Sequence, residues 1–553
     1  MAAQKEKTKV LVIDDERIIR LTLNAKLKQI GYTAVCVASI SEAVTLLKNG
    51  GYKQFKAIIT DIMMGDMNGF VFRDIVRGMD ASMPIFFMTA LDPEEGSGFL
   101  KRIMDDSYSF YLPKSIKPDL LLKRVQSIVA SRMVEEYIKA KDKENMESLS
   151  LAAHLQRKML PPRIKITNTD FYTYLWEPKD IVSGDLLEVM PLPGGGNLYV
   201  LGDIQGHGTS ASLSMMAVES FLKQLPSREN LSTATPAAIA NQIRRFFAEN
   251  LGTLSYMTAL ICIHRPEKGI VDWISCGAPD LQVVDPTSPD AGEINPEHRG
   301  SLPIGLKEDT VYTEADVVST RLSESALCVA FTDGVFDVYR DEDGYEPMPD
   351  SLRVLLQNDL LTEALLKSNL VTAPYKFKMA CEACGYPVFV DDVTELIFGS
   401  CLKHPDVLVR SVPMDDSAVI DKTAQEIEKW CSDQGWDPDI ITKVELVFEE
   451  KMMNLFDHGY DIRDRAGEQA GFSLKKKQDY VEMTVWDWGT QEPSLPMAAG
   501  DLELELDLKN RDFSGHGRGR LMLRKICCGI ERSQYGTLNE TIYRIAPDGE
   551  AEY

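Results

Sequence analysis

Long apolar runs are missing from this 553-residue chain, and so is any excess of positive charge. No apolar run approaches the roughly 20 residues that a membrane-spanning helix needs. Lys and Arg number 60 against 84 Asp and Glu, so the formal net charge is −24 at pH 7. This charge argues against nonspecific binding to nucleic acid and against an anionic membrane surface. We therefore expect protein partners, with no nucleic-acid and no membrane partner.

Paired cysteine motifs and internal repeats are missing as well. The ten cysteines are scattered, which favours free thiols in a reducing cytoplasm. Cys381-x-x-Cys384 has no second pair at zinc spacing, so we interpret both residues as unliganded thiols. The first residues, MAAQKEKTK, are basic, but only Val10–Ile13 precedes Asp14 and Asp15. That pattern predicts a first strand rather than a signal peptide, and a cytoplasmic protein.

The length of the chain is too great for a single core, and about three domains are expected. Changes of pattern along the sequence place the boundaries. We expect a first domain over residues 1–125, a helical connector over 126–162, a second domain over 163–400 and a third over 405–553.

Short apolar runs alternate with helical patterns through the first domain, which predicts a doubly wound, flavodoxin-like parallel sheet. The predicted strands are Val10–Ile13, Ala34–Val37, Ala57–Thr60, Ile85–Met88 and Ser109–Leu112. In such sheets the site lies beyond the carboxyl ends of the strands. Polar residues gather there: Asp14, Asp15, Asp61, Thr89 and Lys114. Three clustered carboxylates repel each other, so the pattern indicates a divalent cation and a phosphoryl acceptor.

These residues, with Asp61-Ile-Met-Met-Gly-Asp-Met-Asn-Gly69, closely resemble the receiver domain of two-component response regulators. The resemblance implies that a sensor histidine kinase phosphorylates Asp61. It also implies Mg²⁺ ligands at Asp14, Asp15 and Asp61, and switch residues at Thr89, Tyr111 and Lys114. Gly65 stands where a proline is usual. Ser115 follows Lys114 where proline is usual, so the customary cis peptide is not expected.

The connector lacks internal glycine and proline from Pro118 to Leu160, and it reads as one helix. Leu121, Val125 and Ile128 suit packing on the sheet of the first domain, whereas Leu151, Leu155 and Met159 fall four apart on one face. The intervening Lys139–Asn145 is almost wholly polar, so the heptad pattern is poor. Two interpretations stay open: a signalling helix that rotates or forms a homodimer, and a solvated spacer. Pro161-Pro162 ends the helix.

Carboxylates at the ends of predicted strands mark the second domain. In Val200-Leu-Gly-Asp-Ile-Gln-Gly-His-Gly208, an apolar run delivers Asp203 into a turn whose glycines allow the backbone to approach a bound ion closely. Three more carboxylate motifs lie in similar settings: Ser183-Gly-Asp185, Thr332-Asp333-Gly-Val335 and Asp391-Asp392-Val-Thr394. Such scattered oxygen ligands suit a hard-cation site.

The order SGD, GDIQGHG, SCGAPD, LPIGL, FTDGV and DDVT resembles the bacterial serine/threonine phosphatases of the PPM class, related to protein phosphatase type 2C. The helix Leu151–Met159 with its Pro161-Pro162 end resembles the lead-in of the same family. These enzymes act in partner-switching control of sigma factors. The resemblance implies an α-β-β-α sandwich that hydrolyses phosphoserine with two Mn²⁺ or Mg²⁺ ions, without a covalent enzyme intermediate.

The same resemblance assigns roles to the carboxylates. Asp203 and Asp333 would be catalytic, with Asp203 bridging both ions beside the Ile204 carbonyl. Asp333 and Asp391 would complete the first metal site and Asp185 would support the second, with Asp392 as an adjacent alternative. Ala278 stands where histidine is usual and Glu188 where aspartate is common. We expect the alanine to slow leaving-group protonation or to alter substrate choice.

The third domain combines helices, a strand and a glycine-rich turn. Helical patterns at Ala424–Trp430 and Ile441–Phe448 lead into Glu450-Lys-Met-Met-Asn454, whose ends share one helix face. The strand Tyr480–Trp486 ends in Asp487-Trp-Gly489. The turn Ser514-Gly-His-Gly-Arg-Gly-Arg520 opens a predicted helix, Leu521–Cys527, and its backbone amides suit polyphosphate.

Together these motifs resemble the GHKL ATPase fold, an α/β sandwich, in the form used by anti-sigma serine kinases. The resemblance implies ATP as a ligand, Asn454 on Mg²⁺, Asp487 on the adenine amino group and Glu450 as the catalytic base. It places Gly515, Gly517 and Gly519 in the phosphate lid. Gly489 is a further expected ATP-binding residue.

The whole chain is therefore expected to be a multidomain α/β and α+β protein that acts on a shared substrate, a phosphorylated anti-sigma-factor antagonist of the STAS type. In the first hypothesis it is a phosphatase and a kinase. In the second, the third domain is a non-catalytic module that binds a sigma factor or the antagonist, and the phosphatase alone is catalytic. A sigma factor or an anti-sigma factor is a further candidate partner.

Overall fold

The computed structural model describes most of the chain. The described residues are 8–48, 50–64, 67–89, 97–167, 169–206, 208–228, 231–251, 255–285, 300–307, 309–340, 346–353, 370–400, 406–460, 467–489, 523 and 525–546. They form two compact units, Met1–Ser148 and Leu149–Tyr553. Among the described helices, none is both long and apolar enough to cross a membrane. Every described cysteine is a free thiol, as the scattered spacing predicted.

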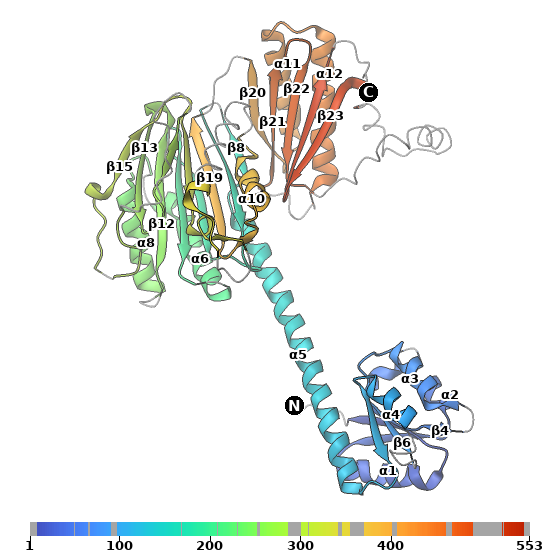
Figure 1. The fold of residues 1–553 in the computed structure, drawn as a ribbon. Helices are drawn as coiled ribbons and strands as arrows, with labels where there is room; N and C mark the ends of the chain where they lie inside the picture. Colours follow the sequence, from blue (N-terminus) through green and yellow to red (C-terminus); the bar gives the residue numbers. More distant parts are fainter. Residues whose placement is uncertain are drawn as a thin grey trace. The chain divides into compact units, whose positions relative to one another are not determined.

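The first unit is built on a five-stranded parallel sheet with the order β2-β1-β3-β6-β7 (Figure 1). Its main elements are β1 (Lys9–Ile13), α1 (Arg17–Gln29), β2 (Thr33–Val37), α2 (Ile40–Leu47), β3 (Phe55–Asp61), α3 (Gly69–Arg77), β6 (Ile85–Thr89), α4 (Ser97–Met104), β7 (Ser109–Pro113) and α5 (Pro118–Met159). Short strands β4 (Met63–Met64) and β5 (Met67–Asn68) follow β3. The predicted doubly wound sheet is confirmed, although the sequence pattern did not predict α4.

Helix α5 is continuous over 42 residues, as the absence of internal glycine and proline predicted. Pro118 occupies its first position, where the missing N–H costs nothing. Leu121, Val125 and Val129 are buried against the sheet of the first unit. Arg132 then anchors the helix through an ion pair to Asp80 at 2.6 Å.

The second unit begins with a sandwich of two five-stranded antiparallel sheets, whose orders are β10-β11-β12-β13-β15 and β14-β16-β19-β9-β8. The strands are β8 (Ile164–Ile166), β9 (Asp170–Glu177), β10 (Asp185–Pro191), β11 (Asn197–Ile204), β12 (Met257–Arg265), β13 (Ile270–Cys276), β14 (Gln282–Val284), β15 (Val318–Arg321), β16 (Leu327–Phe331) and β19 (Val393–Ser400). The helices are α6 (Thr209–Leu222), α7 (Leu225–Arg228), α8 (Pro236–Asn250) and α10 (Ala373–Ala383), and β17 (Val338–Tyr339) pairs with β18 (Val388–Phe389).

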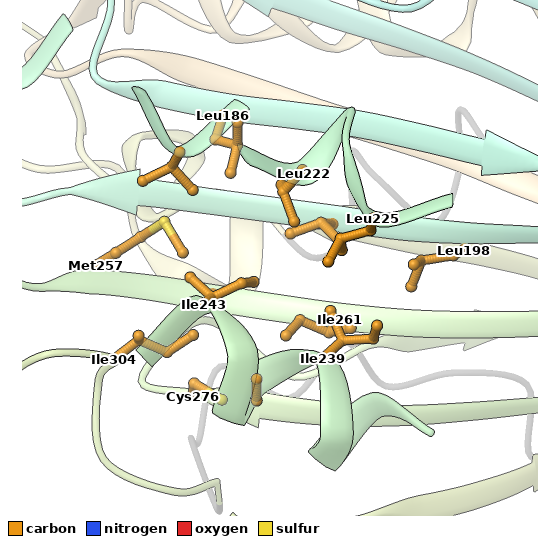
Figure 2. Packing of buried hydrophobic residues seen from close by; sticks show 14 of the residues in the cluster. Leu186, Leu198, Leu222, Leu225, Ile239, Ile243, Met257, Ile261, Cys276 and Ile304 are labelled. Atoms are coloured by element: carbon orange, nitrogen blue, oxygen red, sulfur yellow. The ribbon is translucent and has the colours of Figure 1, made fainter. Parts of the chain in front are cut away.

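Three apolar layers hold the sandwich together. Helices α6 and α8 cover the outer face of the first sheet, where Leu222 and Ile243 meet strand residues such as Leu198 and Ile261 (Figure 2). Between the sheets, Tyr199 stacks on Phe398 with ring centroids 4.1 Å apart. Helix α10 packs on the outer face of the second sheet. The predicted α-β-β-α arrangement is confirmed.

The C-terminal part of the second unit is a five-stranded antiparallel sheet with the order β20-β21-β22-β24-β23, packed against two helices (Figure 1). Its elements are β20 (Val407–Pro413), α11 (Ala418–Asp433), α12 (Pro438–Asn454), η5 (Leu455–Gly459), β21 (Gln469–Lys476), β22 (Val481–Asp487), β23 (Cys527–Tyr535) and β24 (Leu538–Ile545). The expected helix Leu521–Cys527 was wrong at its end, because Cys527 already pairs with Ile545 as the first residue of β23.

Candidate functional site

The carboxyl edge of the first sheet holds a cluster of acidic side chains around one lysine. Lys114 Nζ lies 2.6 Å from Asp61 Oδ2, 3.4 Å from Glu16 Oε1 and 3.8 Å from Asp14 Oδ2. Burial raises the pKa of Asp14, and Asp14 Oδ2 is buried without a hydrogen-bond partner among the described residues. Burial opposes protonation of Lys114, but its bond to Asp61 raises its pKa overall.

Other predicted residues of this edge lie where the strand pattern places them. Thr89 is buried at the end of β6, and its carbonyl accepts from the Lys114 amide at 2.8 Å. Asp15 is exposed next to Asp14, and Tyr111 is half-buried against the core. Glu16, which the sequence pattern did not predict as a site residue, also forms an ion pair with Lys114. Gly65 lies outside the described residues.

In the sandwich, strand register brings Asp185 and Asp203 together. The antiparallel pairing of β10 with β11 sets these two residues directly opposite each other. Like charges in that position repel. Asp185 is fully buried, and its Oδ2 accepts from the Thr332 and Thr394 hydroxyls at 2.9 and 2.5 Å. Burial and then the charge of Asp203 raise the pKa of Asp185 well above its usual range.

Two further carboxylates come from the second sheet. Asp333 follows β16 and Asp391 precedes β19, and these strands are neighbours in the sheet. Gly334 permits the approach of the two turns, since a Cβ there would lie 1.9 Å from the Asp392 carbonyl oxygen. Burial, followed by the charges of Asp333, Asp391 and Asp392, raises the pKa of Asp203 to about 8.

Asp392 has a different position from Asp391. Its two carboxylate oxygens accept from the backbone amides of Lys179 at 2.8 Å and Gly184 at 2.7 Å. Asp392 therefore joins the Ser183-Gly184-Asp185 turn, through Gly184, to the preceding segment at Lys179. Ile204 is buried. Its carbonyl oxygen lies close to Gly184, since a Cβ added at Gly184 would be 3.3 Å from it.

The carboxylates Asp185, Asp203, Asp333 and Asp391 have no ion pair with lysine or arginine among the described residues. Burial and then Asp391 also raise the pKa of Asp333. Asp337 was not predicted from the sequence as a site residue. Burial, followed by the charge of Asp391, raises the pKa of Asp337. No three acidic, histidine or cysteine side chains of the described residues lie close enough together to hold a metal ion. The oxygen-only donors and their mutual repulsion nevertheless fit hard cations.

The end of α5 is hydrogen-bonded to the backbone of Ser183, two residues before Asp185, a contact that the sequence pattern did not predict. The buried Gln156 side chain donates to the Ser183 carbonyl at 2.8 Å and accepts from the Ser183 amide at 3.1 Å. Lys223, which follows α6, donates to the Met159 carbonyl. The last turn of helix α5 and Asp392 thus both bond to the Ser183-Gly184-Asp185 segment, at Ser183 and at Gly184 respectively.

The departures from the family pattern lie in two places. Ala278 is buried with Leu281 and Cys262 in the apolar layer between the sheets. Glu188 lies 3.9 Å from Lys223, and burial raises its pKa to about 7. A cavity of about 310 Å³ opens beside Asp391 and includes Lys179, Lys378 and Phe389 in its lining.

The third site lies where α12 meets the end of β22. Asn454 Nδ2 donates to Glu450 Oε1 at 2.8 Å, so the predicted pair shares one face of α12. Asp487 Oδ1 accepts from the Gly489 amide at 3.1 Å and from Asn539 Nδ2 at 2.9 Å. Lys451 Nζ lies 3.1 Å from Asp487 Oδ2. Gly515, Gly517 and Gly519 lie outside the described residues.

Three family models match separate segments of the chain. Residues 10–126 match the response regulator receiver domain, residues 193–395 match stage II sporulation protein E (SpoIIE), and residues 414–542 match the histidine kinase-like ATPase domain.

Curated relatives are similar over shorter stretches. The "Probable transcriptional regulator ycf27" of Porphyridium aerugineum is 31% identical over 125 residues, which are 22% of this chain and 49% of that protein. The "Transcriptional regulatory protein YvrH" of Bacillus subtilis (strain 168) gives the same values. The chain thus spans about half the length of these relatives.

Two solved structures are similar to larger parts of the chain. The RsbU and RsbW domains of Rv1364c from Mycobacterium tuberculosis are 15% identical, with 70% of this chain and 97% of that chain covered and a TM-score of 0.37. The SiaA-PP2C domain of Pseudomonas aeruginosa is 21% identical, with 47% and 98% covered and a TM-score of 0.38. By its family matches, the chain joins a response regulator receiver domain, a SpoIIE domain of the PPM phosphatase class and a histidine kinase-like ATPase domain, in that order.

Proposed function

We propose that the chain is a response regulator in which phosphorylation of Asp61 controls a metal-dependent phosphoserine phosphatase. The observation that carries this proposal is the carboxylate cluster of the sandwich. Asp203 lies directly opposite Asp185 and close enough to Asp333 and Asp391 for their charges to raise its pKa, and none of the four forms an ion pair with lysine or arginine among the described residues. Folding has brought carboxylates that repel each other close together, and bound cations relieve that repulsion while keeping the groups ionised.

The proposed metal ligands are Asp203, Asp333 and Asp391, with Asp185 and the Ile204 carbonyl in support. Two divalent cations, Mn²⁺ or Mg²⁺, would supply a water of lowered pKa and would neutralise the phosphoryl oxygens. The Thr332 and Thr394 hydroxyls fix the Asp185 carboxylate. We assign Asp392 to positioning rather than to metal, because both its oxygens accept backbone amides.

The proposed substrate is a phosphorylated anti-sigma-factor antagonist of the STAS type, whose phosphoserine would enter from the cavity beside Asp391. The lysines there, Lys179 and Lys378, can attract a phosphoryl group, although Lys378 also pairs with Glu177. The regulatory partner is a cognate sensor histidine kinase. Its phosphoryl group would join Asp61 beside Lys114, with Mg²⁺ held by Asp14 and Asp15.

For the C-terminal domain we propose ATP-dependent phosphorylation of the same antagonist. Glu450 would take the proton of the substrate serine, and Asn454 would hold Mg²⁺. The 2.8 Å bond between them keeps both side chains on one face of α12. Opposing kinase and phosphatase activities on one substrate would make the chain a switch that the receiver sets.

The test uses the full chain and a purified STAS-type antagonist. Incubation of the phosphorylated antagonist with Mn²⁺ should release phosphate, and beryllofluoride should raise the rate. For the kinase, the Asp203→Asn variant with labelled ATP should place label on the antagonist's serine, and adding Glu450→Gln should remove it. No phosphate release by the wild type would overturn the phosphatase. Binding of the antagonist without label would show a binding-only C-terminal domain.

A further inference from the structure

A buried lysine stands in the proposed nucleotide site, where the sequence analysis gave it no role. Lys451 lies on α12 between Glu450 and Asn454, and its side chain is 7% exposed. Its Nζ is 3.1 Å from Oδ2 of Asp487, whose side chain is 3% exposed. Among the described residues this carboxylate is the one recorded partner of the Lys451 ammonium, which has three N–H donors.

The Asp487 carboxylate, which lies beside Lys451, has one oxygen that accepts no hydrogen bond from the described residues. Oδ1 of Asp487 is satisfied by the Gly489 amide at 3.1 Å and by Asn539 Nδ2 at 2.9 Å. Asn539 is held opposite Asp487 by the register of β22 and β24. Oδ2, in contrast, is buried without a hydrogen bond from any described residue, because the Lys451 contact has ion-pair distance but lacks hydrogen-bond geometry.

An ammonium with free donors beside an oxygen with a free acceptor position matches a ligand edge that carries one donor next to one acceptor. The Watson–Crick edge of adenine is such an edge, with the 6-amino group as donor and N1 as acceptor. Guanine carries one acceptor and two donors there, and the second donor would find Oδ1 already occupied. Leaving that donor unpaired in a buried site would weaken binding.

We propose that Lys451 is a second base-recognition residue, which donates to N1 of adenine while Asp487 Oδ2 accepts from the 6-amino group. This inference rests on the proposed nucleotide function of the C-terminal domain and adds the origin of its base specificity. A purely structural ion pair would need neither the free donors nor the unsatisfied Oδ2. Buried ion pairs are in themselves weak contributors to stability, because desolvation offsets their attraction.

The experiment measures binding of ATP, GTP and 1-deaza-ATP to the full chain with Mg²⁺ by calorimetry. In 1-deaza-ATP a C–H group replaces N1, so the acceptor is lost while the amino group stays. For the wild type we expect 1-deaza-ATP and GTP to bind at least about tenfold more weakly than ATP, the effect of losing a bond to a charged group. For Lys451→Met we expect ATP and 1-deaza-ATP to bind with equal affinity.

Lys443→Met is the matched control, because it removes the same charge from the same helix, where Lys443 instead donates to the Ala546 carbonyl. It should keep the preference for ATP over 1-deaza-ATP. Equal binding of ATP and 1-deaza-ATP by the wild type would overturn the role of Lys451, whether or not Lys451→Met folds. No binding of ATP by the wild type would instead overturn the proposed nucleotide function, and the inference with it.

Discussion

The receiver and the phosphatase sandwich both gather carboxylates at strand ends, but only the receiver supplies its own cation. In the receiver, Lys114 lies 2.6 Å from Asp61 and 3.8 Å from Asp14. In the sandwich, Asp203 faces Asp333 and Asp391, and its pKa rises to about 8, chiefly through burial and then through these neighbours. Among the described residues, no lysine or arginine forms an ion pair with that cluster.

The difference corresponds to two kinds of chemistry. In the receiver, the proposed phosphorylation of Asp61 would place the phosphoryl group beside a lysine that can pair with it. A cluster without an internal cation remains electrostatically incomplete until ions from solution bind. The first arrangement suits a switch, whereas the second suits a catalyst that depends on metal.

The largest effect is expected from a substitution in the carboxylate cluster of the sandwich. Asp203→Asn removes the central charge, so metal should bind poorly and phosphoserine hydrolysis should fall by at least about 100-fold, since changes to mere outer-shell partners cost 10–100-fold. The rate is measured with a phosphoserine peptide and Mn²⁺. Near-wild-type hydrolysis by a folded variant would show that Asp203 is not a ligand of the catalytic metals.

A smaller effect is expected from the contact between α5 and the cluster. Gln156→Ala removes both hydrogen bonds to Ser183, so the Mn²⁺ concentration for half-maximal activity should rise about tenfold, with the rate at saturating Mn²⁺ largely kept. Leu155→Ala is the control, because this neighbouring side chain is 46% exposed. An unchanged Mn²⁺ dependence in Gln156→Ala would show that the contact between Gln156 and Ser183 does not affect metal binding.

On the receiver side, we expect beryllofluoride to raise the phosphatase rate about fivefold or more, the lower range of known coupling between sites. Asp61→Ala should abolish the increase and keep the basal rate, because Asp61 lies in the other compact unit. The ratio of rates with and without beryllofluoride is the measurement. A wild-type ratio of one would contradict control by the receiver.

The smallest effect concerns the stability of the metal-free protein. The folded pKa of Asp203, about 8, lies above its unfolded value of about 4. The folded state therefore binds the proton more tightly, and stability should fall as pH rises from about 4 to 8. Thermal unfolding in EDTA should show this fall. Mn²⁺ should reverse it, and Asp203→Asn should flatten it. A steeper fall in Asp203→Asn than in the wild type would contradict this origin.

Periodicity and turn motifs were sufficient to predict the sheet of the receiver, the long helix and the carboxylates at strand ends. Asp14, Asp61 and Lys114 converge because parallel strands end at one edge, a rule that needs no register. The pairing of Asp185 with Asp203 depends on an antiparallel register, and the sequence of either strand alone does not set it.

The missed residues share a physical reason. Gln156, Lys451 and Asn539 are polar side chains within regular helices and strands, where the periodic pattern gives them no signal. Their roles come from contacts with residues 27, 36 and 52 positions away in the chain. Asp391 and Asp392 could not be distinguished by sequence, because the amides of Lys179 and Gly184 that bond to Asp392 lie more than 200 residues away in the chain.

The central claim is that the sandwich cluster is built to take cations from solution. Its most direct test is equilibrium binding of Mn²⁺ to the full chain carrying Asp61→Ala and Asn454→Ala, which silence the two other proposed metal sites. The account predicts two Mn²⁺ ions per chain, with binding lost or strongly weakened when Asp203→Asn is added. An absence of Mn²⁺ binding, or binding that is unchanged by Asp203→Asn, would contradict it.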